Sequence, residues 1–272
     1  MRLSIRRVAP IVLFLLYAGY YYLTHLENVP ITGRQQLVDL TAEEEKKLGL
    51  QSYREILQKS QVVEEGDLVN QVRKIGKRIA AVVNLPHADW EFNLINAQQL
   101  NAFALPGGKV AVYTGIVPVA ENVNGMAVIM GHEIGHVLAR HGAERLAYEK
   151  LKNLGMLAMT ASVSDMDMKT QAVVMGALGL GSHYGMTLPF SRSHESEADY
   201  IGLLLMSRAC FDPNEAYKFW QRMGKAAGDG KQPAEFMSTH PSHNTRIRQL
   251  QQWIPEALKE QAKFCKKPVP VS

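Results

Sequence analysis

The stretch from Gly131 to His136 reads Gly-His-Glu-Ile-Gly-His, and it constrains the fold more than any other part of this sequence. It lies within an apolar run, Val123 to Leu138, of the kind that forms a buried helix. Positions four apart on a helix lie one turn apart on the same face, so His132 and His136 can point ring nitrogens at one metal ion. Glu133 lies about 100° round the helix from His132, where its carboxylate can act as a general base on an attacking water.

A second helical pattern supplies a third ligand. It begins after Ser191 or Ser193, and either residue is a suitable N-cap. Glu195 would complete a set of two histidines and one carboxylate, with the fourth position left to water. Asp199 follows one turn later and could accept a hydrogen bond from the free ring N–H of a ligating histidine. Spacing alone does not exclude Glu197, which points to another face of the helix.

These two motifs, together with three further segments, make the sequence similar to metallopeptidase family 48. The similar segments follow one another in the order Val29–Arg34, Asn101–Gly108, His132–Gly142, Glu195–Asp199, and Ser238–Pro241 with Arg246. The resemblance covers most of the chain from about Val29 to Leu250. The chain lacks the several membrane spans of the prenyl proteases in this family, which argues against prenylated substrates.

The resemblance implies roles for the residues of the site. It implies that His132, His136 and Glu195 bind zinc, with one ion per chain. It also implies that Glu133 is the general base of metal-assisted peptide hydrolysis.

The fold implied by the family is α+β: a mostly helical zincin (gluzincin-like) domain with a small, edge-exposed β-sheet, preceded by one transmembrane helix. The segment from Asn101 to Thr114 is expected to form a sheet edge beside the cleft. Its first residues, Asn101, Ala102, Phe103 and Ala104, could hold an extended substrate by backbone pairing, which reads little side-chain identity.

His240 is a further candidate, because it follows two small hydroxyl residues and precedes Pro241. Three roles stay open: a loop histidine bonded to backbone, a catalytic donor to the oxyanion, and a reversible fourth zinc ligand on a mobile loop. Arg246, six residues further on, is expected to support the site from outside the ligand set. If His240 blocked the site, the chain would be a latent protease or a zinc-stabilised holdase.

The remaining histidines give weaker signals. His141 lies five residues after His136 and so faces about 140° away, which favours a structural role. His183 and His194 are expected to be surface or capping groups. His25 and His87 have no candidate partners around them.

The N-terminus predicts a membrane anchor. Met1 to Arg7 carries three arginines, and Val8 to Leu23 is uninterrupted and apolar, with three tyrosines near its end. No small residues stand at the spacing of a cleavage site, so an uncleaved single-pass anchor is favoured over a signal peptide. The preceding arginines place the catalytic domain across the inner membrane, in the periplasm or, in a mitochondrion, the intermembrane space.

Composition excludes several other functions. The net charge is +4, and Lys and Arg are scattered without a basic block, so nucleic-acid binding is not expected. A deformylase-type site would need a cysteine ligand upstream of the histidine motif, but Cys210 and Cys265 both lie downstream. The sequence leaves open whether these two thiols form a disulfide, and it leaves the oligomeric state open too.

Periodicity and turn residues predict the other elements. Helices are expected over Ala42–Lys59, Leu68–Val83, about Glu121–Lys150, Pro213–Met223 and Asn244–Lys263, a loop over Gly228–Gln232, and strands over Trp90–Ile95, Asn101–Leu105 and Val110–Thr114. Leu151 to Gly185 reads as a helical hairpin with two apolar pieces of about ten residues, each too short to cross a bilayer. A hairpin packed over the cleft is favoured over a lid that dips into the membrane.

The sequence thus predicts three regions: an anchor at 1–28, a zinc metallopeptidase domain at 29–264 and a tail at 265–272. The predicted function is zinc-dependent endopeptidase activity on unfolded or misfolded envelope proteins, which is protein quality control at a membrane.

Overall fold

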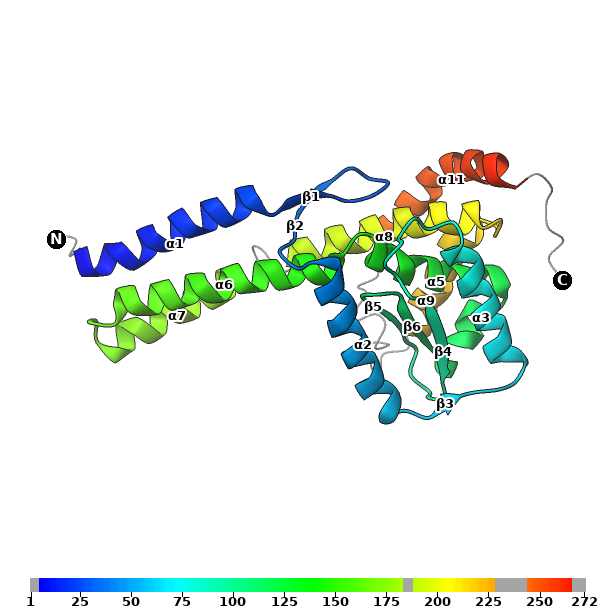
Figure 1. Ribbon diagram of the computed structural model, residues 1–272, viewed down its shortest axis with the longest axis horizontal. Helices are drawn as coiled ribbons and strands as arrows, with labels where there is room; N and C mark the ends of the chain where they lie inside the picture. Colours follow the sequence, from blue (N-terminus) through cyan, green and yellow to red (C-terminus); the bar gives the residue numbers. More distant parts are fainter. Residues whose placement is uncertain (1–4, 183–187, 228–243, 266–272) are drawn as a thin grey trace. The chain divides into compact units, whose positions relative to one another are not determined.

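The computed structural model describes residues 5–182, 188–227 and 244–265, without the side chains of 180–182, 188–190, 227 and 244. The chain forms two compact units, and each is built from two separate segments (Figure 1). Residues 1–40 and 141–193 make the first unit, and residues 41–140 and 194–272 make the second. Helices predominate, the sheets are small, and one apolar helix stands near the N-terminus, so the expected α+β class is confirmed. The expected domain boundaries at 28 and 264 remain predictions.

The first unit is mostly helical. It contains α1 (Ile5–Thr24), the antiparallel strands β1 (Leu26–Asn28) and β2 (Gln35–Leu37), α6 (His141–Val163) and α7 (Met168–Ser182). Among the described residues, α1 is the one helix long and apolar enough to cross a membrane. Buried Tyr21, Leu37 and Ala147 form a small core where α1, β2 and α6 meet. The expected hairpin after residue 150 is present as the second half of α6 and α7.

The second unit contains the sheet and most other helices. They are α2 (Ala42–Gln58), β3 (Val62–Val63), α3 (Asp67–Ala80), β4 (Glu91–Ile95), β5 (Ala102–Leu105), β6 (Lys109–Tyr113), the 3₁₀ turn η1 (Thr114–Ile116), α4 (Val117–Ala120), α5 (Val123–Leu138), α8 (Leu188–Arg208) from residue 194 onward, α9 (Glu215–Ala227) and α11 (Asn244–Phe264). The three strands predicted in this region are confirmed to within about two residues. The short strands β1, β2 and β3 were not predicted.

The sheet has the order β3-β4-β6-β5, with β4 and β6 parallel and the other pairs antiparallel. The two central strands are apolar and mostly buried, as expected for strands covered on both faces. The expectation that the whole segment from Asn101 to Thr114 lies at the edge is wrong, because β6 lies inside the sheet. Within this segment only β5 is an edge strand, and it packs against α5.

The single long helix expected from Glu121 to Lys150 is interrupted, so this prediction is also wrong. Helix α5 starts after Asn122, whose side chain accepts hydrogen bonds from the first turn, and it ends at Leu138. Arg140 adopts a left-handed backbone conformation with φ of 55°, and α6 begins at the next residue. The Arg140 side chain bonds the buried carboxylate of Glu45 at 2.6 and 2.8 Å. This charge-assisted contact offsets the unfavourable backbone conformation.

The expected N-cap at Ser191 or Ser193 is wrong as well, because both residues lie inside α8. The helix begins at Leu188 and has Pro189 in its first turn, where a proline removes no helical hydrogen bond. The expected loop over Gly228–Gln232 lies outside the described residues.

A disulfide joins the two cysteines, which settles the pairing that the sequence left open. Cys210 follows α8, Cys265 follows α11, and their Cα atoms are 5.8 Å apart. The bridge ties the end of the last helix to the helix that carries Glu195.

Candidate metal site

Three side chains from two helices converge in the second unit. His132 and His136 lie on α5 with their Nε2 atoms 3.1 Å apart. Glu195 on α8 places one carboxylate oxygen 3.3 Å from Nε2 of His132 and the other 3.4 Å from Nε2 of His136. Among the described residues this is the one group of three or more His, Cys, Asp or Glu side chains that could hold a metal ion.

The spacing of these atoms fits zinc. Four ligands at about 2.0–2.1 Å from the ion in a tetrahedron lie about 3.3 Å from one another. The two ring nitrogens are 3.1 Å apart, and each has one oxygen of Glu195 at 3.3 or 3.4 Å, which is close to that edge length. Two neutral imidazole nitrogens and one carboxylate are also a ligand set found in zinc hydrolases, where the fourth position stays open.

Glycines explain how Glu195 comes so close to the histidines. A Cβ on Gly202 of α8 would lie 2.7 Å from the backbone carbonyl carbon of Gly131, and one on Gly135 would lie 2.8 Å from the carbonyl oxygen of Ala198. No larger residue fits there without a shift of the backbone, so α5 and α8 pack directly against each other. Sequence reasoning missed this role, because a glycine inside a helix indicates only a lower helix propensity.

We expect Gly202→Ala to destabilise the protein by about 1–3 kcal/mol and to weaken metal binding, because the added methyl group forces α5 and α8 apart. The matched control is Gly224→Ala on α9, where a Cβ meets nothing within 4 Å. This control should be neutral or more stable by up to about 1 kcal/mol. Denaturant unfolding and metal titration measure both effects, and equal behaviour of the two variants would rule out the packing argument.

Asp199 and Arg246 form hydrogen bonds and ion pairs with the ligand side chains and with each other. Asp199 Oδ1 lies 3.0 Å from Nδ1 of His132, which leaves Nε2 of that ring to face Glu195. Arg246 on α11 donates to both oxygens of Asp199 at 2.6 and 2.7 Å, and its third nitrogen lies 3.2 Å from Glu195. The Trp220 ring lies beneath the guanidinium at 3.7 Å and meets His132 edge-on. The expected support by Asp199 and Arg246 agrees with this geometry; Trp220 was not anticipated.

The charges of this cluster favour a cation at the ligand atoms. Burial alone would lower the pKa of His132, but hydrogen bonds and charges from Asp199 and Glu195 outweigh it and raise that pKa from 6.5 to about 9. Burial alone would raise the pKa of Asp199, but the Arg246 charge outweighs it and holds that pKa below its usual value. The carboxylates that stabilise a proton on His132 would stabilise a metal cation in the same place.

Glu133 is buried next to His132 on α5, and its charge acts on Arg246. Its position agrees with a base beside the ligands. Glu197 is nearly buried but does not belong to the ligand group, so the geometry favours Glu195 as the sequence did.

Four further histidines had roles weighed from the sequence. His194 is buried, so its expected surface or capping role is wrong. His141 is also buried and stands in the first turn of α6, in agreement with a structural role. His240 and His183 lie outside the described residues, so the roles weighed for His240 remain predictions.

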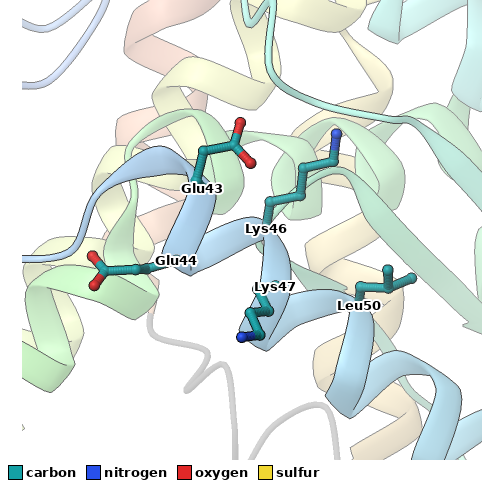
Figure 2. Close-up of a pocket in the computed structure, with 5 residues that line it drawn as sticks. All are labelled: Glu43, Glu44, Lys46, Lys47 and Leu50. Carbon is teal, nitrogen blue, oxygen red and sulfur yellow. The ribbon is translucent and has the colours of Figure 1, made fainter.

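A surface hollow in the second unit, along α2, is lined by Glu43, Glu44, Lys46, Lys47 and Leu50. Figure 2 shows these charged side chains pointing in different directions rather than converging. Because it contains no set of metal ligands, we do not assign it a role in the chemistry.

Two histidines one turn apart, one buried and one half-buried, with a carboxylate from a second helix and a further carboxylate beside them, define a metal-dependent hydrolase of the metallopeptidase class. The model of Peptidase family M48 matches residues 68–254, and the chain belongs to this family.

The relatives agree. The protein named mitochondrial metalloendopeptidase OMA1 from Schizosaccharomyces pombe is 39% identical, over 91% of this chain and 72% of its own. The human metalloendopeptidase OMA1 is 32% identical, over 88% of this chain and 48% of its own. The beta-barrel assembly-enhancing protease of Escherichia coli is 27% identical, over 81% of this chain and 46% of its own. The chain is therefore a metalloendopeptidase.

Proposed function

We propose that this metalloendopeptidase binds one zinc ion through His132, His136 and Glu195 and cleaves unfolded or misfolded proteins at a membrane. The observation that carries the proposal is the convergence of the two histidine nitrogens, 3.1 Å apart, with the carboxylate of Glu195, whose oxygens lie within 3.4 Å of them. When bound, zinc lowers the pKa of a water molecule and polarises the scissile carbonyl.

The chain's own groups carry the proton steps. Glu133 takes a proton from the attacking water and delivers it to the leaving amine. Asp199 accepts the Nδ1–H of His132 and so fixes the tautomer in which Nε2 can bind a cation. Arg246 keeps Asp199 ionised and in place.

The substrate proposal rests on the sheet edge. Strand β5 is an edge strand next to α5, and Asn101 directly precedes it. This position supports the proposal that Asn101, Ala102, Phe103 and Ala104 pair with an extended peptide backbone. Backbone pairing requires an unfolded segment and selects little by side chain, which suits clearance of misfolded envelope proteins. The name of the Escherichia coli relative, which refers to β-barrel assembly, favours such a role.

We also propose that α1 is an uncleaved, single-pass anchor in the inner membrane. Arg6 and Arg7 stand at its start, so the catalytic unit would face the periplasm, or the intermembrane space of a mitochondrion. The Cys210–Cys265 disulfide favours the same side, because disulfides persist in oxidising compartments. Relatives named as mitochondrial proteins agree with a membrane-bounded compartment of this kind.

The test is cleavage of one protein in its folded and unfolded forms by the purified full-length chain. We expect cleavage of the unfolded form only, with loss of activity on chelation and recovery with zinc. Glu195→Ala should lose both metal and activity, whereas Glu197→Ala should keep both, since only Glu195 lies among the ligand atoms. Metal analysis showing loss from the Glu197 variant instead would mean that the wrong carboxylate has been assigned.

A further inference from the structure

Helix α6 follows α1 along most of its length, in the opposite direction (Figure 1). At the start of α1, Arg7 donates from Nε to both oxygens of Asp165, each at 2.9 Å. In the middle, a Cβ on Gly155 would lie 3.0 Å from the Phe14 ring. At the far end, Tyr21 joins the buried core of the unit. Arg7 and Tyr21 are 14 residues apart, which corresponds to about 21 Å of helix.

The turn between α6 and α7 therefore reaches the level at which α1 begins. Near the middle of α6, Lys150 lies beside the far end of α1, 5.0 Å from the Tyr21 ring, and forms an ion pair with Asp39 at 2.6 Å. Between Lys152 and Asp165 there is no charged residue, and none stands between Lys169 and the end of α7. The charges of this unit thus gather at two levels, with an apolar band between them.

This band is exposed. Leu157 on α6 and Val173 on α7 each expose 65% of their surface, and the adjoining α1 exposes Leu13, Leu15 and Leu16 to a similar degree. This many exposed apolar side chains on three helices that pack in sequence, α1 on α6 and α6 on α7, indicate a cover other than water.

Two hydroxyl groups within the band are hydrogen-bonded to their own helix. The hydroxyl of Thr160 donates to the carbonyl oxygen of Met156 at 2.9 Å, and that of Ser162 donates to Ala158 at 2.8 Å. A hydroxyl that donates to a carbonyl oxygen of its own helix needs no hydrogen bond from water. Polar groups in a hydrocarbon environment must be satisfied within the protein in this way. At the turn, by contrast, Asp167 accepts from both the backbone and the side chain of Thr170 and caps α7.

We propose that the α6–α7 hairpin lies within the lipid bilayer beside α1, with its turn at the interface where α1 begins. This inference rests on the proposed anchor: if α1 crosses the membrane, the ion pair with Arg7 takes Asp165 to the same side. The apolar stretch of α6, about 12 residues or 18 Å, is shorter than a hydrocarbon core of about 30 Å, so local thinning of the bilayer accompanies it. Lipid fits better than a second protein copy, because all three helices expose apolar side chains between two charged levels.

The test is thiol accessibility in sealed membrane vesicles of known orientation. Cys210 and Cys265 are joined in the disulfide, so a membrane-impermeant maleimide reads only an introduced thiol. Met168→Cys marks the turn, where Met168 is 86% exposed. Leu157→Cys and Val173→Cys mark the band, because Leu157 and Val173 each lie eight residues from Asp165. Ile5→Cys marks the start of α1 and Glu65→Cys the catalytic unit; both residues are exposed.

We expect Met168→Cys and Ile5→Cys to be labelled from one face and Glu65→Cys from the other, while the two band thiols react only after detergent is added. If Met168→Cys and Glu65→Cys were labelled from the same face of the membrane, and Ile5→Cys from the other face, the hairpin proposal would be wrong. The proposal that α1 spans the membrane would still hold. That result with protected band thiols would indicate a protein cover outside the bilayer. If Ile5→Cys and Glu65→Cys were labelled from one face, the anchor and the proposal would fail together.

Discussion

Glu133→Gln should lower the turnover of an unfolded substrate by on the order of 10²- to 10⁴-fold, because the amide cannot take the proton from the attacking water. The change keeps the shape of the side chain and removes no ligand atom. The metal content of the purified variant should therefore equal that of the unaltered chain, and the variant should unfold no more easily.

The control for this result is Glu65→Gln, which makes the same change at an exposed position outside the site. Its turnover should be unchanged. Full activity in Glu133→Gln with metal bound would show that another group serves as the base, while loss of metal would show that Glu133 belongs to the ligand set.

Arg246→Met should cost about 3–5 kcal/mol of unfolding free energy in the metal-free protein, because it leaves Asp199 and Glu195 as buried carboxylates without their cation. Metal affinity should also fall by about 10- to 100-fold, since Asp199 is no longer held against His132. Guanidinium unfolding and competitive metal titration measure the two effects.

Lys263→Met on the same helix is the matched control. Lys263 also pairs with a carboxylate, that of Glu260, but its side chain is 66% exposed. Replacing an exposed partner of this kind should cost less than about 1 kcal/mol and should not change metal affinity. Similar losses in the two variants would indicate a general effect on α11 rather than a role in the site.

The local parts of the site could be predicted from the sequence because a helix has a fixed period. Residues four apart on one helix must share a face, so spacing alone places His132 beside His136 and Glu195 beside Asp199. The family resemblance then joined the two helices. The choice of Glu195 over Glu197 depended on that resemblance, and the ligand distances support it.

The other features depend on contacts between distant segments, which no local pattern reveals. Arg140 takes a left-handed conformation that its residue type disfavours, and only the buried Glu45 accounts for it. Gly202 acts through the backbone it meets on another helix. Arg7 and Asp165 pair although they are 158 positions apart in the sequence. The position of the α6–α7 turn relative to α1 could therefore not be predicted from the composition of the hairpin.

The interleaving of the two units has a consequence for how the protein is made. Each unit consists of two segments, and the first unit is completed by an insertion between α5 and α8, the helices that supply the ligands. During synthesis α1 is made long before residues 141–193, with which it packs, and His132 long before Glu195. Neither unit can finish folding until most of the chain has left the ribosome, so both fold through contacts of long sequence separation. A nascent chain would thus carry no assembled metal site until Glu195 and Arg246 have been synthesised.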